Sequence, residues 1–271
     1  MRRFSFHKGH GTKNDFIILD DSYAMHEMHP EVIRAVCDRR SGVGADGVIR
    51  VVRGSSMRDW EGDGSLWFMD YYNADGSVAE MCGNGLRVFA RHLVNEQLVD
   101  ASDFDVATRA GIRHVSVGHH GLITTSMGEA RVLDDDVTVR LGTQSWPATK
   151  VDVGNPHAVV FLDGDDLARL DLHRPPVWSP DTAFPDGANV EFVRVDGPGT
   201  LSMRVFERGV GETQSCGTGV VAAAAAHRSR TSHPGVIAVS VPGGELSVRF
   251  SGDAAELTGP AVMTGRGEYW V

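Results

Sequence analysis

The sequence predicts an α+β protein built from two modules that are related by pseudo-twofold symmetry. A Cys-Gly-x-Gly motif occurs twice, at Cys82 and at Cys216, 134 residues apart in a chain of 271. Each motif precedes a segment with helical periodicity, and strand-like segments outnumber helical ones in both halves. One helix within a mainly β half is typical of an α+β module rather than of alternating βαβ units.

Further matches at the same spacing support the duplication. Asn73 lies nine residues before Cys82, and Glu207 lies nine residues before Cys216. One short motif could recur by chance, whereas several matches in the same order indicate two copies of one module. With only two copies, the pattern indicates an internally duplicated protein rather than a solenoid.

The modules are expected to meet near the middle of the chain. We place the first at residues 1–141 and the second at residues 142–271, each of an ordinary domain size. Residues 142–150 are the expected crossover between them. The end of the chain could pair back with the first module.

The individual elements follow from local patterns. Segments rich in β-branched and aromatic residues are expected to be strands, and segments with apolar residues on one face are expected to be helices. Pro30 suits the first turn of a helix. The expected strands are 16–19, 48–52, 66–72, 114–117, 151–153, 158–161, 189–195, 201–206 and 246–250, and the expected helices are 30–39, 86–96 and 220–230.

Composition excludes several classes of protein. Apolar residues make up 41% of the chain and charged residues 23%, as in ordinary globular domains. The formal net charge of −10 argues against a nucleic-acid groove or a basic membrane face. No signal peptide or membrane-spanning run is visible. Three cysteines do not form a disulfide framework, so we expect a reducing, cytoplasmic setting.

The two motif cysteines differ from an ordinary buried cysteine. A lone cysteine is usually a small core residue, and Cys37, on the apolar face of helix 30–39, fits that description. Cys82 and Cys216 are each followed by glycine and each precede a helix. A helix N-terminus has unpaired N–H groups and a positive potential, which favour a thiolate and bind a carboxylate. We therefore interpret the pair as functional.

Two opposed thiols suit the inversion of a carbon centre. Inversion removes a proton from one face of the carbon and returns a proton to the other face, so one thiolate and one thiol can act in either direction. Helix N-termini directed at the adjoining carboxylate would stabilise the carbanion, as an oxyanion hole does. No metal or pyridoxal phosphate is required in principle. A pyridoxal enzyme needs a Schiff-base lysine, and the candidates are Lys8, Lys13 and Lys150.

Three other motifs point elsewhere and are set aside. Residues 42–47 match Gly-x-Gly-x-x-Gly, but they follow a predicted helix and precede a strand, the reverse of a dinucleotide-binding context. His114, His119 and His120 lie in a polar turn without a companion metal-ligand pattern, so no metal site is expected. Residues 214–217 resemble a cysteine-protease nucleophile, an interpretation that leaves Cys82 unexplained.

Taken together and in order, the motifs resemble those of the diaminopimelate epimerase family over nearly the whole chain. They are His10-Gly11-Thr12-Lys13-Asn14-Asp15-Phe16, Gly42-Val43-Gly44-Ala45-Asp46-Gly47, Asn73-Ala74-Asp75-Gly76-Ser77, Met81-Cys82-Gly83-Asn84-Gly85, Gly154-Asn155-Pro156-His157, Gly187-Ala188-Asn189-Val190, Glu207-Arg208-Gly209-Val210-Gly211-Glu212-Thr213 and Ser215-Cys216-Gly217-Thr218-Gly219.

The resemblance implies a role for each matching residue. Cys82 and Cys216 would be the two catalytic acid/bases. The backbone at Gly83, Asn84, Gly217 and Thr218 would hold the reacting carboxylate. The distal amino-acid end would contact Asn14, Asn73, Asn155, Asn189 and Arg208, and the reacting amine would lie near His157 and Glu207. Arginine can hold a carboxylate with two parallel hydrogen bonds, which suits this role.

The resemblance also implies a fold, a reaction and partners. Each module would be a mainly antiparallel, barrel-like sheet around a central helix, with the active site between the modules. The reaction would interconvert LL- and meso-diaminopimelate without a cofactor or metal, in lysine and cell-wall precursor synthesis. The partner would be this small molecule, with no nucleic acid and no membrane, and the chain could form a homodimer.

Two alternatives and two departures stay open. A proline or hydroxyproline racemase would share the fold and the cysteine pair, and a non-catalytic relative would only bind an amino acid. Asn84 and Arg208 favour a substrate with a second amino-acid end. Many family members have Gln at the position of Gly47, and the loop before Asn14 carries Lys13 in place of the commoner glycine.

Overall fold

The computed structural model describes residues 3–118, 120–164 and 166–270. The chain divides into two compact units. Unit 1 comprises Met1–Thr125 and Gly259–Val271, and unit 2 comprises Ser126–Thr258. The chain thus passes from unit 1 to unit 2 between residues 125 and 126, within β7 (Ile123–Glu129), and returns between residues 258 and 259, whereas the sequence analysis drew one boundary between residues 141 and 142.

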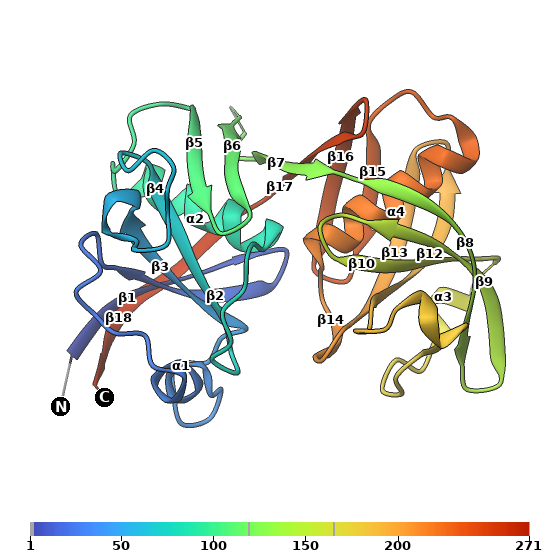
Figure 1. Cartoon of the computed structure of the whole chain (residues 1–271), viewed down its shortest axis with the longest axis horizontal. Helices are drawn as coiled ribbons and strands as arrows, with labels where there is room; N and C mark the ends of the chain where they lie inside the picture. The colour runs from blue at the N-terminus through green and yellow to red at the C-terminus, as the bar shows by residue number, and fades with distance from the viewer. Residues whose placement is uncertain (1–2, 119, 165, 271) are drawn as a thin grey trace. The chain divides into compact units, whose positions relative to one another are not determined.

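Unit 1 is a curved, mainly antiparallel sheet with one long helix (Figure 1). Its ladder runs β18–β1–β2–β3–β4–β5–β6–β7, in which β2–β3 and β4–β5 are the parallel pairs. The elements are β1 (Arg3–Gly11), β2 (Asn14–Asp20), α1 (Pro30–Cys37), β3 (Gly47–Arg53), η1 (Gly54–Ser56), β4 (Trp67–Asn73), α2 (Gly83–Asn95), β5 (Asp103–Thr108), β6 (Gly111–Val117), β7 (Ile123–Glu129) and β18 (Val262–Trp270).

Unit 2 repeats the same ladder. Its strands run β8–β9–β10–β12–β13–β15–β16–β17, and the parallel pairs, β10–β12 and β13–β15, fall at the same two places. The elements are β8 (Arg131–Leu141), β9 (Gln144–Asp152), β10 (Pro156–Leu162), α3 (Asp166–Arg169), β11 (Val177–Ser179), η2 (Asp181–Ala183), β12 (Asn189–Gly197), β13 (Thr200–Glu207), β14 (Gly211–Thr213), α4 (Gly217–Thr231), β15 (Ile237–Val241), β16 (Gly244–Ser251) and β17 (Ala254–Gly259). The predicted duplicated α+β fold is therefore confirmed.

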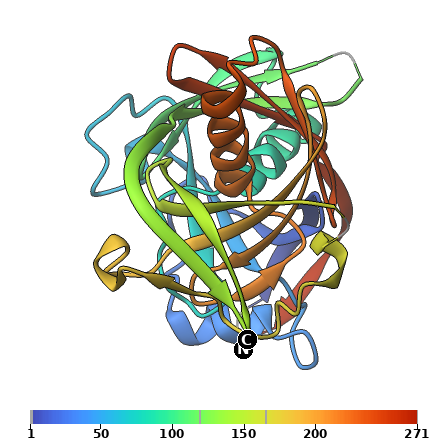
Figure 2. The same ribbon diagram turned by 90° about the vertical axis from the view of Figure 1, so that its right-hand side faces the viewer.

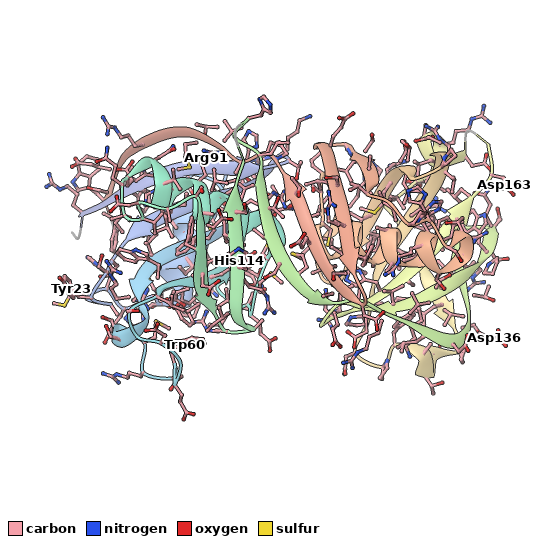
Figure 3. The ribbon with its side chains drawn as sticks, turned by 90° about the horizontal axis from the view of Figure 1, so that it is seen from above. Tyr23, Trp60, Arg91, His114, Asp136 and Asp163 are labelled. Carbon is pink, nitrogen blue, oxygen red and sulfur yellow. The ribbon has the colours of Figure 1, made fainter. Side chains whose placement is uncertain are left out.

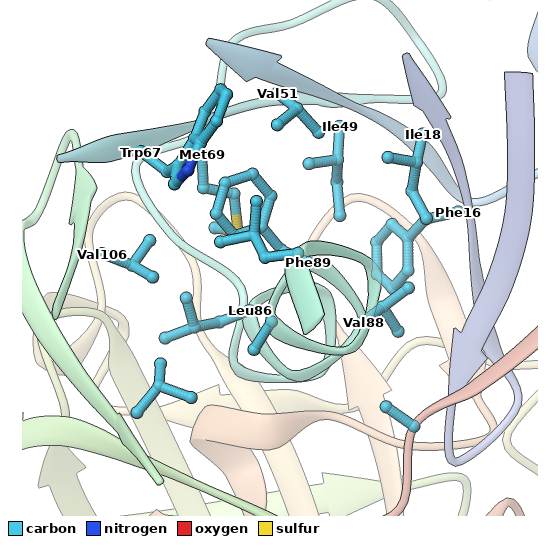
Figure 4. Close-up of a cluster of buried hydrophobic side chains, with 14 of the residues drawn as sticks. Phe16, Ile18, Ile49, Val51, Trp67, Met69, Leu86, Val88, Phe89 and Val106 are labelled. Carbon is cyan, nitrogen blue, oxygen red and sulfur yellow. The ribbon is translucent and has the colours of Figure 1, made fainter. Parts of the chain in front are cut away.

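The helix of unit 1 forms the centre of that unit's core. The side chains of Leu86, Phe89 and Leu93 on α2 are fully buried. They pack against Phe16 on β2 and Met69 on β4 in one apolar cluster (Figure 4). Burying a large apolar side chain contributes about 1.5–3 kcal/mol, so α2 is held by its packing more than by its intrinsic helix propensity.

The helix of unit 2 is buried on every side from Val220 to His227. Residues 222–226 are five consecutive alanines, all buried, and α4 contacts β8, β9, β10, β12, β13, β15 and β16 (Figure 2). Alanine is the best helix former, and its small side chain lets the strands approach the helix axis. A helix without a polar face is expected in such a position.

Both long helices begin three residues before their predicted starts, at Gly83 and at Gly217. The cysteines therefore occupy the N-cap positions. The expected crossover, residues 142–150, differs more: it is a turn followed by most of β9, which pairs with β8 inside unit 2. Gly142 has a φ of +61°, a conformation that glycine adopts without strain and that suits the tight turn between these strands.

The ends of the described chain belong to the same unit, because β1 and β18 pair antiparallel from Arg3–Trp270 to His10–Val262. No helix of the described residues is long and apolar enough to cross a membrane.

Candidate active site

In unit 1, Cys82 caps helix α2. Its Sγ accepts a hydrogen bond from the backbone N–H of Gly85 at 3.4 Å, and its backbone is extended, as an N-cap requires. The thiol also faces Asn14 at the start of β2, with 3.7 Å between Sγ and Oδ1. Nδ2 of Asn84 donates to the same Asn14 oxygen at 3.2 Å. Unit 1 thus brings together three of the residues predicted for the site.

A buried cation lies behind this thiol, and the sequence analysis missed it. Arg87 is fully buried in the first turns of α2, where it donates to Oδ1 of Asn84 at 2.8 Å and to the carbonyl of Gly83 at 3.1 Å. Burial lowers the pKa of Arg87 to about 10, and the neighbouring Cys82 opposes that shift. Arg87 remains protonated at neutral pH, so it places a positive charge beside Cys82.

Other predicted residues of unit 1 have different neighbours. Asn73, at the end of β4, accepts from the Tyr71 hydroxyl at 2.9 Å and donates to the Ser77 hydroxyl at 3.0 Å. A Cβ on Gly47 would lie 2.7 Å from the Tyr71 ring and 2.6 Å from the Tyr72 carbonyl. Any side chain at position 47 would therefore clash with these two tyrosines.

In unit 2, Cys216 caps helix α4 in the same way. Its Sγ accepts from the backbone N–H of Gly219 at 3.4 Å, the same distance and the same relative position as at Cys82. The Thr218 hydroxyl is 3.5 Å from the sulfur. The predicted pair of helix N-terminal cysteines is thus reproduced in both units, each with an N–H of its own helix directed at the sulfur.

The surroundings of Cys216 are acidic, in contrast to those of Cys82. The Glu207 carboxylate is a hydrogen-bond neighbour of the thiol and also accepts from the Thr213 hydroxyl. Burial raises the pKa of Glu207. Burial also raises the pKa of Cys216 well above its ordinary value, and the nearby carboxylates Glu207 and Glu191 act in the same direction. Cys216 is therefore a thiol at neutral pH.

Two further predicted residues flank this site. His157, on β10, is fully buried with Nε2 3.0 Å from Oδ1 of Asn155, and Nδ2 of Asn155 donates to the Thr218 hydroxyl at 3.4 Å. The other ring nitrogen of His157 faces Glu191 on β12 at 2.7 Å. Glu191 was missed, although it lies two residues after Asn189 and hence on the same face of that strand.

Asn189 and Arg208 are joined by a loop contact. Oδ1 of Asn189 accepts from the backbone N–H of Arg208 at 2.9 Å, and the Arg208 guanidinium donates to the carbonyl of Asp186 at 3.1 Å. A Cβ on Gly187 would lie 2.9 Å from Cδ of Arg208. Packing against Gly187 restricts the position of the Arg208 side chain, and the hydrogen bond to Asn189 holds the Arg208 backbone in place.

Among the described residues, one histidine group has ligand atoms close enough for a metal ion. The ligand atoms of His7, His92 and Glu96 lie within 4.8 Å of one another. Asp20 borders this group, with an oxygen 2.7 Å from Nε2 of His92 and another 3.6 Å from His7. His114 lies on strand β6 (Figure 3) rather than in the predicted polar turn. Its Nδ1 is 2.9 Å from an oxygen of Asp105 on β5, and His119 lies outside the described residues.

Comparisons with known proteins match nearly the whole chain. The diaminopimelate epimerase family model matches residues 6–133 and 149–270. A diaminopimelate epimerase of Streptomyces coelicolor is 47% identical over 277 residues, which cover 98% of this chain and 96% of that protein.

Solved structures of lower identity share the fold. A hydroxyproline epimerase from Agrobacterium vitis matches with a TM-score of 0.68 at 16% identity, covering 98% of this chain and 92% of its own. A Bacillus anthracis phenazine biosynthesis protein of the PhzF family matches with a TM-score of 0.71 at 15% identity, covering both chains completely. The family model and the identity to the Streptomyces enzyme extend over nearly the whole sequence, and so the chain belongs to the diaminopimelate epimerase family.

Proposed function

We propose that this chain interconverts LL- and meso-diaminopimelate by proton transfer between two cysteines, without a cofactor, in lysine and cell-wall precursor synthesis. The observation that carries the proposal is the matched pair of caps: Cys82 and Cys216 each accept an N–H from the third residue of their own helix, at 3.4 Å. Family membership supports the choice of substrate.

The two thiols have surroundings of opposite charge. Cys82 lies beside the buried cation Arg87, which favours a thiolate. Cys216 lies near the carboxylates of the buried Glu191 and the half-buried Glu207, which favour the thiol. One thiolate and one thiol are the pair that a two-base inversion needs at the start of a turnover. Cys82 would remove the α-proton and Cys216 would return one, with the roles exchanged in the reverse reaction.

The reacting carboxylate would lie against the first N–H groups of the two helices. These belong to Gly83 and Asn84 on α2 and to Gly217 and Thr218 on α4. At a helix N-terminus such groups have no partner within the helix and carry a partial positive charge. They would stabilise the negative charge that spreads into the carboxylate as the α-carbon is deprotonated.

The distal end of the substrate would be bound by polar side chains. Arg208 would hold the distal carboxylate with two hydrogen bonds, and Asn14, Asn73, Asn155 and Asn189 would contact the distal amino-acid group. His157 and Glu207 would line the site beside the reacting amine, where Glu207 offers a negative partner for an ammonium. We further propose a cytoplasmic enzyme, and a homodimer that light scattering would test.

A substrate screen tests the function. Purified protein is incubated with LL-diaminopimelate, meso-diaminopimelate, proline and trans-4-hydroxyproline, and the stereoisomers are separated on a chiral column. We expect the two diaminopimelate isomers to interconvert and both imino acids to be left unchanged, since neither has a distal carboxylate and amine. Inversion of proline or hydroxyproline with inert diaminopimelate would overturn the proposal, and inversion of none would favour a non-catalytic relative.

A further inference from the structure

Two histidines and two carboxylates form a cluster in unit 1, away from the catalytic cysteines. His7 is on β1, Asp20 ends β2, His92 is in the last turn of α2, and Glu96 is the C-cap of that helix (Figure 1). His92 follows Cys82 by ten residues, which is about 15 Å along the helix axis. All four residues of the cluster belong to unit 1, so their arrangement does not depend on the position of unit 2.

The fold directs these four side chains toward one place. His7 lies opposite Ile18 in the antiparallel β1–β2 pair, so both side chains point to the same face of the sheet. Ile18 is fully buried in the same apolar cluster as side chains of α2, and Asp20, two residues further along β2, points to that face as well. His92 and Glu96 are four residues apart and therefore share one side of the helix.

Three potential ligand atoms converge in this cluster. One ring nitrogen of His7, one ring nitrogen of His92 and a carboxylate oxygen of Glu96 lie within 4.8 Å of one another. Nδ1 of His7 is 3.7 Å from Oε1 of Glu96. Two ligands of a tetrahedral zinc ion, each about 2.0–2.1 Å from the metal, are about 3.3 Å apart. The Glu96 side chain is 40% exposed, so it has the freedom to close the remaining gap.

The imidazole of His92 is only half satisfied by protein groups. Oδ1 of Asp20 is 2.7 Å from Nε2 of His92. His92 is fully buried, and within the described part of the chain its Nδ1 has no hydrogen-bond partner. A buried polar atom without a partner costs free energy and calls for an explanation. An ion on Nδ1 would supply the missing partner, and Asp20 would hold the opposite nitrogen, as carboxylates do behind zinc-bound histidines.

The charges around the cluster favour a cation. Within the described residues, Asp20 and Glu96 form ion pairs with these two histidines and with no lysine or arginine. Glu96 is the C-cap of α2, where the free carbonyls of the helix carry a partial negative charge. The side chains of Asp20 and Glu96 are 48% and 40% exposed, which gives an ion a path from solvent to the histidines.

We propose that His7, His92 and Glu96 form a binding site for a zinc ion, with Asp20 holding His92 from behind. Two imidazole nitrogens and one carboxylate oxygen suit zinc, whereas magnesium and calcium prefer oxygen ligands alone. The bound ion would tie strand β1 to the last turn of α2. It would lie too far from Cys82 to take part in proton transfer, so the inference does not rest on the proposed function.

Equilibrium dialysis of the untagged, full-length chain against zinc tests the site. Thiolates also bind zinc, so Cys82→Ala and Cys216→Ala are introduced together as the background for every measurement. We expect the background protein to bind one zinc ion per chain. His7→Gln removes one ligand from a partly exposed position, and it should weaken binding by at least about 10–100-fold, since even the partners behind a zinc ligand contribute that much.

The matched control is His114→Gln. It removes another histidine of unit 1 that lies beside a carboxylate, with Nδ1 2.9 Å from an oxygen of Asp105, and it should bind zinc as tightly as the background protein does. Glu96→Gln removes the anionic ligand at the exposed end of α2. It should weaken zinc binding as well, and it keeps the test decisive if His7→Gln fails to fold.

Urea denaturation gives a second readout. A ligand that binds the folded state stabilises it by mass action, so zinc should raise the urea midpoint of the background protein and of His114→Gln, and should leave the midpoint of Glu96→Gln nearly unchanged. A background protein that binds no zinc overturns the proposal, and so does equal zinc affinity in the background protein and in Glu96→Gln. Neither measurement uses epimerase activity, so a failure of the proposed function would leave this test intact.

Discussion

The two motif glycines, Gly85 and Gly219, are equivalent in sequence and in secondary structure but differ in what surrounds them. Each is the third residue of its helix, and each donates its N–H to the cysteine cap at 3.4 Å. An alanine keeps that N–H. Replacing each by alanine therefore compares the space around two otherwise matched positions.

The structure predicts that alanine is tolerated at Gly85 and destabilises the protein at Gly219. A Cβ at Gly85 would meet Cδ1 of Ile49 at 3.3 Å, the mobile end of an aliphatic side chain. A Cβ at Gly219 would meet Oε1 of Glu191 at 2.7 Å, and that oxygen is held in a 2.7 Å contact with His157. Only the first neighbour can move without breaking a polar contact.

The expected changes in the free energy of unfolding differ between the two variants. Replacing glycine by alanine inside a helix gains about 0.5–1 kcal/mol in the free energy of unfolding. At Gly85 the tight contact with Ile49 offsets this gain, so the net change should lie within about 1 kcal/mol of zero. At Gly219, overpacking costs about 1–3 kcal/mol and a lost hydrogen bond to a charged group about 1.5–3 kcal/mol, for a net loss of about 2–5 kcal/mol.

Urea denaturation of both variants beside the wild type measures this difference. Circular dichroism follows the α-helices, and equal m-values are required before the midpoints are compared. Equal stability of the two variants, or a larger loss in Gly85→Ala, would refute the assignment of a fixed carboxylate above the start of α4.

Two further substitutions test other parts of the structure. Burial raises the pKa of Cys37 to about 11 from an ordinary value of 9.0, so between these pH values the folded state keeps a proton that the unfolded chain releases. The free energy of unfolding of the wild type should therefore fall with rising pH more steeply than that of Cys37→Ala. Urea midpoints of the two proteins that run parallel from pH 8 to pH 11 would contradict this. Arg208→Lys keeps the charge and loses the two parallel hydrogen bonds to the distal carboxylate. The kcat/KM for diaminopimelate should therefore fall about 10–100-fold, the equivalent of one hydrogen bond to a charged group. Near-native steady-state kinetics would exclude the proposed carboxylate contact.

The sequence predicted the duplicated fold because the duplication lies in features with local causes. Glycines after each cysteine and apolar periodicity beyond them indicate helix starts, and the structure has α2 and α4 there. The predicted starts were three residues late because a cysteine is not among the usual N-cap residues. In this protein each cysteine sulfur accepts the N–H of the third helical residue. Apolar periodicity does not reveal such a cap.

Several strands were not predicted, because their patterns are weak. In β1 (Arg3–Gly11), the two buried residues are glycines, and the rest of the strand is half-buried or exposed. Strand β9 carries Pro147 and Lys150 and has Val151 as its buried residue, which explains why residues 142–150 were taken for a crossover. Strand pairing over long sequence separations determines these elements, and no local pattern encodes it.

The charged residues that distinguish the two cysteines were also missed. Arg87 lies in a helix and Glu191 in a strand, where charged side chains are normally exposed. Both are fully buried, because each lies beneath or beside the N-terminus of a central helix. The position of Glu191 two residues after Asn189 was the available sign, since alternate residues of a strand face the same side.

Deuterium incorporation tests the central claim, that Cys82 and Cys216 exchange the α-proton of diaminopimelate from opposite faces. Purified protein is incubated with LL-diaminopimelate in D₂O, and the α-hydrogens are followed by ¹H NMR and mass spectrometry. The wild type should form meso-diaminopimelate that carries deuterium at the inverted carbon. Cys82→Ala and Cys216→Ala should each lose epimerisation by at least about 10²–10⁴-fold, the usual contribution of one general acid or base. Undiminished inversion in either variant, or inversion that retains the original hydrogen, would contradict the two-thiol account.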